Sequence, residues 1–514
     1  MTAQVASEGL RLAEFLAALS LATDLGMGQP LEQALRTCLI ALALGERLGL
    51  GPDDLSDVYY VALLRFLGCT ADAHDFAELV GGDDIGLRAA IAPVLGAPPS
   101  EFASAVLPKI GAGQNPLVRA GLVLGMIRAG KERAREGVRA HCELSEHLAL
   151  RLGLGAGVRT GLQAAFEHWN GQGLPNGWTG EQIPAPARIV FVARDIEIPH
   201  RLGGLDRALD AVRRRRGASY DPAVADVFVG AASDVLGRLE TSSPWEAVLD
   251  QEPGARPSVL EHRLDTVLEA FADFVDLKSP FTVGHSRALA ELAAAASRED
   301  RTTLRRAALV HDLGRVSVPN GIWDKAARLT EGEWERVRLH PYYSERILGR
   351  VQALRAMATL AGMHHERVDG SGYHRGSARG DIPSGARVLA AADAFQAMTQ
   401  PRAYRAALEP ARAAQELEAM ASSGGLDREA VNRVLIAAGH TVTSTRGSWP
   451  AGLTEREVEV LRVICRGGTK KQVASMLSIS PSTVDHHVRH IYEKAGVQTR
   501  AGATLFALDH DLLK

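Results

Sequence analysis

The chain has few cysteines, few aromatic residues and no long apolar run. Its four cysteines, Cys38, Cys69, Cys142 and Cys465, lie far apart and form no C-x-x-C pair. This spacing argues against a disulfide-built extracellular fold and predicts a reduced, cytoplasmic protein. No stretch approaches the ~18 consecutive apolar residues of a membrane helix, and no basic-then-apolar leader opens the chain. We therefore expect neither secretion nor contact with a membrane.

A large excess of charge of either sign is also missing. The formal net charge is −3 over 514 residues, so any case for nucleic-acid binding has to be local. Aromatic residues make up 5% of the chain, while Ala, Leu and Arg are abundant and recur with helical periodicity. An all-α protein follows from that pattern. The length predicts two to four domains, because a single core rarely grows so large.

Two stretches rich in Pro, Ser, Thr and Gly interrupt the helical pattern, residues 241–258 and 439–450. Such composition is typical of linkers. They divide the chain into three predicted domains, residues 1–240, 259–438 and 451–514.

The first two of these domains resemble copies of one another at a constant offset of 199 residues. Glycine and proline recur at fixed spacing, which implies the same backbone turns, because these residues restrict or free φ. The matching positions are His141 with His340, Ser145-Glu146 with Ser344-Glu345, Glu167 with Glu366, Gly171 and Gly173 with Gly370 and Gly372, Ile183-Pro184 with Ile382-Pro383, and Arg188 with Arg387. Further upstream, residues 62–70 resemble residues 308–316.

The second copy contains a set of residues that suits divalent metal ions. Two adjacent pairs and three single residues lie beside apolar helical segments: His285, His311, Asp312, His340, His364, His365 and Asp393. Imidazole and carboxylate together suit iron, manganese, zinc or nickel. The first copy lacks this set: it has Arg65 and Phe66, Ala165 and Phe166, and Arg194 where the second has its ligands, and retains only His141. We predict that the first copy is free of metal.

Helical periodicity predicts where the metal ligands lie. We expect His311 and Asp312 on the last turn of a helix over 304–314, and His364 and His365 at the end of a helix before an Asp-Gly turn. Asp393 falls inside an apolar helix, where an unpaired carboxylate would be costly to bury. Two ions ~3.5–4 Å apart would stabilise the attacking and leaving oxygens of phosphoester hydrolysis.

The strings HDLGR, HHERVDGSGYHRG and DIPSGARVLAAADAFQAMTQPRAYRAAL resemble the HD-GYP branch of the HD-domain metal-dependent phosphohydrolases. That resemblance, over about residues 260–438, implies hydrolysis of cyclic di-GMP or a related nucleotide with two divalent ions, iron or manganese. One ion would be held by His285, His311, Asp312 and Asp393, and the other by Asp312, His340, His364 and His365. A glutamate that binds a third ion in some members is Phe281 here.

The same resemblance implies basic residues that contact phosphate. Arg402 and Arg405 match the phosphate-contacting positions, and Arg315 stands where the motif has a lysine. Guanidinium groups suit phosphate oxygens. With Asp312, these three arginines are the predicted catalytic residues.

Residues 451–514 carry a different pattern. Thr454 and Glu457 form an expected capping box, and two helices joined by a tight turn at Pro481 predict a helix-turn-helix. The segment resembles the four-helix LuxR-type DNA-binding domain. By that resemblance the residues facing DNA are Lys470, Lys471, Ser482, Thr483, Asp485, His486 and Arg489. An acidic side chain such as Asp485 can accept from a cytosine amino group.

Together these features predict a bacterial transcriptional regulator that combines a phosphodiesterase with DNA binding and acts as a homodimer. Two alternatives stay open. A non-catalytic transcription factor could use the metal site only to bind a nucleotide, which the departures from the motif at Arg315, His374 and Gln396 would suit. A pure dimerisation scaffold is the other, although a scaffold has no use for a complete ligand set.

Overall fold

The computed structural model describes residues 10–441, 449–466, 468–510 and 512–513, and the regular secondary structure of this part of the chain is almost entirely helical. Its only sheet pairs two short antiparallel strands, β1 (Leu10–Arg11) and β2 (Ser258–Val259), with Leu10 opposite Val259. The predicted all-α class is confirmed. The chain divides into two compact units, Met1–His440 and Thr441–Lys514.

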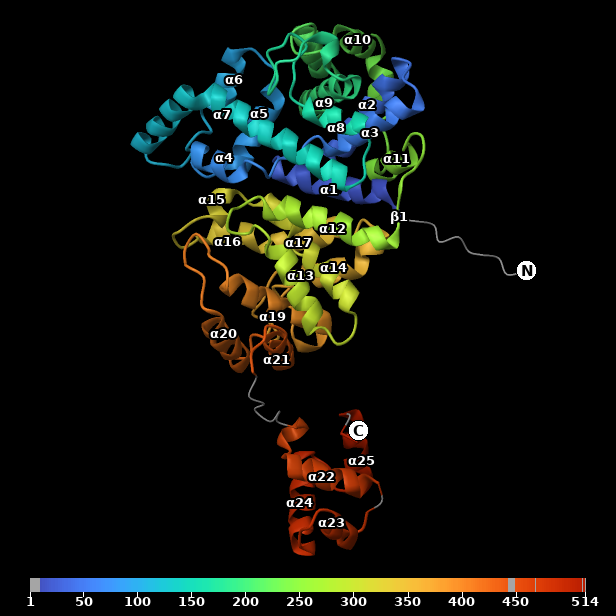
Figure 1. Ribbon diagram of the computed structural model, residues 1–514, viewed down its shortest axis with the longest axis vertical. Helices are drawn as coiled ribbons and strands as arrows, with labels where there is room; N and C mark the ends of the chain where they lie inside the picture. Colours follow the sequence, from blue (N-terminus) through green and yellow to red (C-terminus); the bar gives the residue numbers. More distant parts are fainter. Residues whose placement is uncertain (1–9, 442–448, 467, 511, 514) are drawn as a thin grey trace, which may run out of the picture. The chain divides into compact units, whose positions relative to one another are not determined.

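The first copy of the repeat builds one half of the larger unit (Figure 1). Its helices are α1 (Leu12–Gly26), α2 (Gln33–Arg47), α3 (Pro52–Leu64), α4 (Ala73–Val80), α5 (Asp84–Ile91), η1 (Ala92–Val94), α6 (Pro99–Val106), α7 (Pro116–Arg151), α8 (Ala156–Gln163), η2 (Gly180–Gln182), α9 (Ala185–Arg215), α10 (Pro222–Gly237) and α11 (Pro244–Asp250).

The second copy builds the other half. Its helices are α12 (Glu261–Asp276), α13 (His285–Ala296), α14 (Arg301–Val310), η3 (Leu313–Ser317), α15 (Asn320–Trp323), α16 (Glu331–Arg338), α17 (His340–Leu348), η4 (Gln352–Leu354), α18 (Arg355–Gly362), η5 (Arg379–Asp381), α19 (Ser384–Met398), α20 (Pro410–Ser422) and α21 (Arg428–Ala437).

The two copies repeat the same local structures at the offset found in the sequence. Helices α8 and α18, the turns η2 and η5, and the starts of α9 and α19 are each 199 residues apart. Buried Glu167 and Glu366 both accept hydrogen bonds from backbone N–H groups nine and eleven residues later. A Cβ on Gly68 or Gly314 would lie 2.0 Å from the carbonyl oxygen of His141 or His340, respectively. Both copies thus need glycine where two backbones meet.

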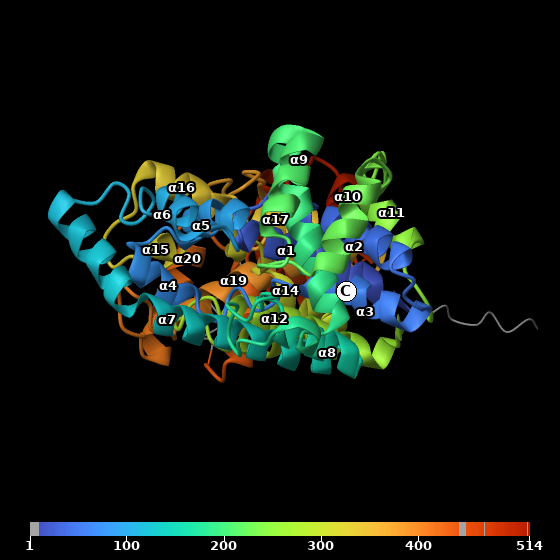
Figure 2. The same ribbon diagram turned by 90° about the horizontal axis from the view of Figure 1, so that it is seen from above.

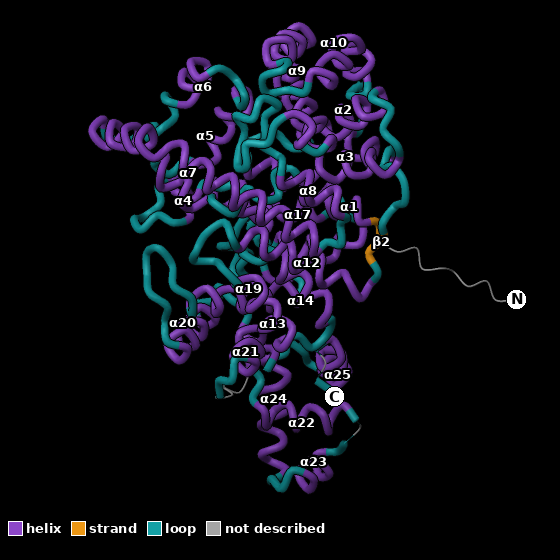
Figure 3. The backbone as a smooth tube through the Cα atoms, turned by 45° about the horizontal axis from the view of Figure 1, so that its top comes forward, coloured by secondary structure: helices purple, strands orange, loops and turns teal. Residues whose placement is uncertain are grey.

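The copies pack against each other within the larger unit. Helix α1 contacts α17 and η3, and α7 contacts α12; the view from above and the backbone tube both show α1 beside α17 (Figures 2 and 3). Ion pairs cross between them, from Arg151 to Asp273 and from Arg350 to Glu32. The copies therefore form one folded body.

The segment 241–258, predicted as an irregular linker, contains both α11 and β2. Trp245, Val248 and Leu249 of α11 are buried, because apolar residues three and four apart share one face of a helix. This segment is a packed part of the larger unit. Most of the second expected linker, residues 442–448, lies outside the described residues.

The smaller unit contains η6 (Pro450–Gly452), α22 (Glu455–Cys465), α23 (Lys470–Met476), α24 (Pro481–Lys494) and α25 (Arg500–Asp509). Thr454 and Glu457 form the expected capping box at the start of α22. Its core has buried side chains from all four α-helices, among them Leu461, Val473, Ile491 and Ala507. This is the four-helix arrangement that the sequence predicts.

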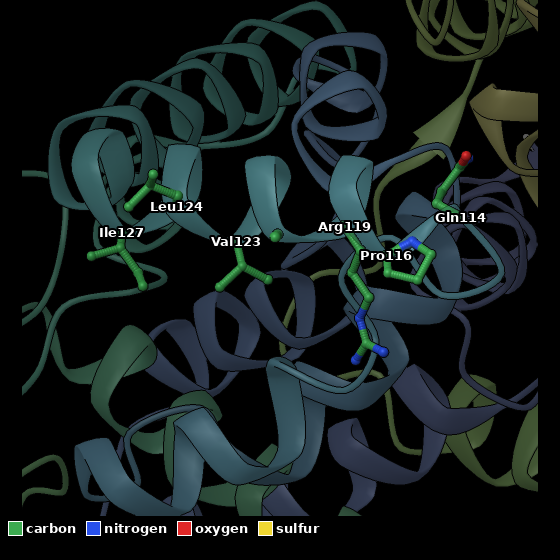
Figure 4. Close-up of a pocket in the computed structure, with 7 residues that line it drawn as sticks. Gln114, Pro116, Arg119, Val123, Leu124 and Ile127 are labelled. Carbon is green, nitrogen blue, oxygen red and sulfur yellow. The ribbon is translucent and has the colours of Figure 1, made fainter.

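A groove of about 470 Å³ runs along the first half of α7 (Figure 4). It is lined by Gln114, Pro116, Arg119, Ala120, Val123, Leu124 and Ile127. None of these belongs to the predicted metal ligands. Within the described ranges, no helix is both long and apolar enough to cross a membrane.

The glycine contacts lead to a stability prediction. We expect Gly68→Ala and Gly314→Ala each to destabilise the larger unit by about 3 kcal/mol or more, because the added methyl overlaps backbone that cannot move easily. Gly332→Ala is the control, since this exposed glycine of α16 has nothing within 4 Å of its Cβ position. Urea unfolding monitored by circular dichroism measures the difference. Equal stability of the Gly68 variant and the control would contradict the close approach.

Candidate metal centre

The structure brings the seven predicted ligands of the second copy together from five segments. They come from α13, the turn between α14 and η3, the start of α17, the loop after α18, and α19. Six of them are buried, and His365 is partly exposed: the six are His285, His311, Asp312, His340, His364 and Asp393. Their ligand atoms form overlapping groups within 4.8 Å of one another. Residues more than 100 positions apart therefore share one site.

The ligand atoms divide into two sets that meet at Asp312. One group contains His285, His311 and Asp393, and a second contains His340, His364 and His365. Asp312 Oδ2 lies 3.3 Å from His311 Nε2, while Asp312 Oδ1 lies 3.3 Å from His340 Nε2 and 3.5 Å from His364 Nε2. One carboxylate oxygen thus faces each set, as a bridging ligand between two ions requires.

Backbone carbonyls fix the orientation of three imidazole rings. The Nδ1 atoms of His311, His340 and His364 lie 2.8, 2.6 and 2.6 Å from the carbonyl oxygens of Ala308, Val337 and Ala361. Each carbonyl belongs to the residue three positions earlier, so the turn of the chain itself supplies the acceptor. With a proton on Nδ1 donated to that carbonyl, each ring would offer its Nε2 to a metal.

The electrostatics of the site call for added positive charge. Burial alone would raise the pKa of Asp312, but His311 and Arg315 hold it well below its usual range. Asp393 behaves in the same way, because bonding to His285 and the charge of His365 outweigh burial and lower its pKa. Against the effect of burial, the two carboxylates raise the pKa of His311 to about 9. Buried Nε2 of His311 has no hydrogen-bond partner among the described residues. This donor set fits divalent cations.

The helices end slightly earlier than the sequence suggests. Helix α14 ends at Val310, so His311 follows it and Asp312 begins the tighter turn η3. Helix α18 likewise ends at Gly362, before His364 and His365. After α14 the chain passes close to the backbone of His340 at Gly314, where a Cβ would lie 2.0 Å from the His340 carbonyl oxygen. This turn directs Asp312 between the two histidine sets.

Arg315 contacts the carboxylate that lies between the two sets. Its Nη1 donates to Asp312 Oδ2 at 2.9 Å, and its guanidinium lies 4.0 Å from the ring centroid of Trp323. The indole Nε1 of Trp323 donates to the Arg315 carbonyl at 3.1 Å. Arg315 therefore orients Asp312 through a charge-assisted bond.

Arg402 and Arg405 lie in a turn after α19, where a β-bridge joins them. Nη1 of Arg402 donates to the Phe281 carbonyl at 2.6 Å, and burial together with the charge of Arg315 lowers the pKa of Arg402. Arg405 instead donates to carbonyls of the turn and of the end of α19. It neutralises the negative end of that helix. Arg402 keeps other donors available, whereas Arg405 stabilises the turn.

Sequence reasoning missed three residues around the site. Gln400 Oε1 lies 3.0 Å from His285 Nδ1, and the Tyr373 ring lies 4.7 Å from that of His365. Trp323 lies 5.5 Å from the His340 ring. Tyr373 stands inside the motif that carries the family resemblance, which was a usable signal. Gln400 also stands inside a quoted motif, just before Pro401, whereas nothing in local spacing marks Trp323, because only the fold brings it to the ligands.

In the first copy, aromatic and guanidinium groups occupy the positions of the ligands. The Arg65 guanidinium lies 5.6, 5.2 and 4.9 Å from the ring centroids of Phe66, Phe166 and Phe191. Arg194 is buried and paired with Asp195. Burial, followed by a smaller effect of Arg194, lowers the pKa of Arg65. The guanidiniums place positive charge in the first copy where the second has its metal ligands.

The predicted DNA-facing residues all lie in the smaller unit, and most of them are exposed. Ser482, Thr483, His486 and Arg489 are exposed on α24, which begins after the N-cap Ser480. Asp485 is partly exposed and paired with Lys470 of α23. Exposed Lys471 follows on the same helix. Residues 482, 486 and 489 repeat with helical spacing and present one polar face.

Comparisons with known proteins now identify the class of protein. The HD domain family matches residues 129–224 and 269–430, and the luxR family of bacterial regulatory proteins matches residues 451–507. The chain belongs to the HD-domain family, whose phosphohydrolases are metal-dependent, and it carries a LuxR-type DNA-binding domain.

Its relatives are cyclic dinucleotide phosphodiesterases. The 3′3′-cGAMP-specific phosphodiesterase 3 of Vibrio cholerae is 33% identical over 413 residues, 79% of this chain and 90% of that relative. The crystal structure of a V. cholerae cyclic GMP-AMP specific phosphodiesterase is similar with a TM-score of 0.59 and 27% identity, covering 84% of this chain and 99% of that one. A cyclic di-GMP phosphodiesterase of Thermotoga maritima is 37% identical over 121 residues, 23% of this chain and 33% of that relative.

The buried arginines of the first copy give a second stability prediction. None of the three side-chain nitrogens of Arg65 has a hydrogen-bond partner among the described residues. We expect Arg65→Met to leave the free energy of unfolding unchanged or to raise it by up to about 2 kcal/mol, because a poorly compensated buried charge is removed. Arg194→Met should lower it by roughly 3 kcal/mol, since Asp195 and the Ala92 carbonyl lose their donor. Urea unfolding of both variants measures the change in the free energy of unfolding. Strong destabilisation by Arg65→Met would contradict the prediction.

Proposed function

We propose that this protein is a cyclic dinucleotide phosphodiesterase whose output is DNA binding. The observation that carries the proposal is the position of Asp312, with one carboxylate oxygen toward each histidine set. A regulator that only needed a fold could dispense with this arrangement, as the first copy does. The complete ligand set therefore supports chemistry.

In this proposal the site holds two divalent ions, with iron or manganese as the best fit to a donor set of imidazole and carboxylate. His285, His311 and Asp393 would hold one ion, and His340, His364 and His365 the other, with Asp312 shared. When bound, the ions would supply positive charge to the attacking and leaving oxygens of the phosphoester.

The chain's own residues would bind and orient the phosphate. Arg315 fixes the bridging carboxylate, so Asp312 keeps both oxygens in place. Arg402 is held by the Phe281 carbonyl through Nη1, which leaves its Nε and Nη2 to donate to a phosphate oxygen. Burial strengthens such a contact because fewer waters compete for the charge. Arg405 remains a predicted phosphate contact, although its hydrogen bonds favour a role in the turn.

The substrate class follows from the relatives. Because those proteins are named for cyclic GMP-AMP and cyclic di-GMP, these two molecules are the substrates to test first. The LuxR-type domain would bind DNA in the cytoplasm. The protein would do so as a homodimer, since helix-turn-helix proteins commonly read two half-sites. Hydrolysis would then remove the cyclic dinucleotide, which is the signal to which the DNA-binding domain responds.

The central prediction concerns the ligand set. We expect the His311→Ala/Asp312→Ala variant to lose bound metal and to lose at least ~10³-fold in turnover of both cyclic dinucleotides, because one change removes a ligand and the other the bridge. Metal per chain is measured by elemental analysis and turnover by chromatography of the products. Asp300→Asn is the control, since this exposed residue caps the far end of the same helix, α14.

The outcomes separate the possible functions. Turnover by the wild type and its loss in the double variant support the enzyme. Bound metal and nucleotide without turnover would favour a nucleotide-sensing transcription factor. A wild type without metal would leave only a scaffold.

The DNA-binding surface gives a separate prediction. We expect Arg489→Ala to weaken binding to a duplex selected by the wild-type protein by roughly 10-fold or more, because an exposed arginine of α24 would contact base edges or phosphates. Fluorescence anisotropy at fixed salt measures the affinity. Arg466→Ala is the matched control, since Arg466 is exposed but lies after α22 and bonds to the Leu513 carbonyl. Equal loss in both variants would argue for non-specific charge effects and against this assignment of α24.

A further inference from the structure

A buried polar contact joins the metal-free copy to the copy that carries the metal ligands. Asp84, the first residue of α5, is 1% exposed. Its Oδ2 accepts from Lys278 Nζ at 3.3 Å, and its Oδ1 accepts from the backbone N–H of Asn320 at 2.8 Å. Both partners belong to the second copy, and both are buried. One carboxylate of the first copy therefore ties together two loops of the second.

Backbone contact reinforces this link. The N–H of Gly321 donates to the Gly82 carbonyl at 2.9 Å. A Cβ on Gly321 would lie 2.4 Å from the Cα of Gly82. The turn between α4 and α5 thus packs directly against α15, with no room for a side chain between them.

A second carboxylate makes the reciprocal contact from the other side. Asp324 of the second copy lies 2.8 Å from His74 Nδ1 of the first copy. It also accepts from Ser279 Oγ at 2.6 Å and from Asn320 Nδ2 at 3.2 Å. The loop at residues 278–282 and the segment 320–324, which contains α15, are therefore bonded both to each other and to the first copy.

The first of these loops leads directly to a metal ligand. The N–H of His285 donates to the Thr282 carbonyl at 2.9 Å, and Thr282 Oγ1 donates to the Asp276 carbonyl at 2.8 Å. The Asp276 carboxylate accepts from both N–H and Oγ of Ser286, the residue after the ligand. The orientation of His285 thus depends on the loop that begins at Lys278.

The loop at residues 278–282 and the segment with α15 also position the arginines of the site. The carbonyl of Phe281, within the first loop, accepts from Arg402. Trp323, at the end of α15, lies against the Arg315 guanidinium. Displacing either loop would move a guanidinium that the proposed function uses.

We propose that Asp84 is a positioning residue for the metal centre, supplied by the metal-free copy. This inference rests on the proposed function and gives the degenerate copy a role, because its buried carboxylate holds Lys278 and Asn320 so that His285 and Arg402 stay aligned. A buried ammonium without its partner is strongly unfavourable, so loss of Asp84 would expel Lys278 and shift the loop. The first copy acts on the site without containing any of its ligands.

The experiment uses the full-length protein and three variants. Asp84→Asn removes the charge, and Asp83→Asn is the matched control, because neighbouring Asp83 is exposed and bonds only within its own turn. The double variant Asp84→Asn/Lys278→Met removes both buried charges and keeps the protein folded if the single variant is unstable. The measurements are Mn²⁺ affinity by calorimetry, hydrogen exchange of the peptide covering 276–286, and kcat and KM for cyclic GMP-AMP and cyclic di-GMP.

We expect Asp84→Asn to weaken Mn²⁺ binding by roughly 10-fold, as for other residues that orient ligands. Exchange protection of residues 276–286 should fall, and kcat should drop more than KM rises. The double variant should regain thermal stability but not Mn²⁺ affinity, which a merely structural role would restore. Mn²⁺ affinity and exchange equal to those of Asp83→Asn would overturn the inference. If the wild type showed no turnover, the proposed function would be wrong, but the inference about Asp84 would not be affected. The Mn²⁺ affinity and the hydrogen exchange would still decide the role of Asp84.

Discussion

The metal centre depends on one carboxylate. Asp312 turns one oxygen toward His311 and the other toward His340 and His364, and Arg315 holds it from behind. A buried carboxylate is costly unless it is paired, and here its partners come from three segments of the chain, residues 311–315, the start of α17 and the loop after α18. The early end of α14 and the glycine that follows both serve to bring this residue between the two histidine sets.

The repeat separates what the fold needs from what the chemistry needs. Both copies keep the close glycine contact, the buried glutamate that binds backbone N–H groups, and the helices on either side. Only the second keeps the ligands, while the first contains Arg65 among phenylalanine rings. The scaffold folds with or without the seven predicted ligands, so their presence in one copy supports the proposed function rather than a need of the fold. The first copy contacts the second through Asp84, which bonds to Lys278 and Asn320, and the proposed positioning role of Asp84 would give that copy a function.

Much of the architecture could be predicted because its signals are local. Ligands at fixed spacing, the capping box at Thr454 and the constant offset between copies can all be found from the order of residues alone. The prediction was less accurate where distant packing decides. The segment 241–258 contains helix α11 because its apolar side chains find a core. The Arg405 guanidinium donates to a backbone carbonyl near the end of α19, and the sequence does not reveal this contact.

The sequence by itself determined the all-helical class, the pairing of a ligand-bearing copy with a ligand-free one, and the helix-turn-helix. These features follow from side-chain chemistry and short-range periodicity. Only the tertiary structure decided which oxygen of Asp312 faces which histidines, that Gln400 and Trp323 belong around the site, and that Asp84 reaches Lys278 across the copies. Those contacts join residues far apart in the chain, and their geometry exists only once the core has packed.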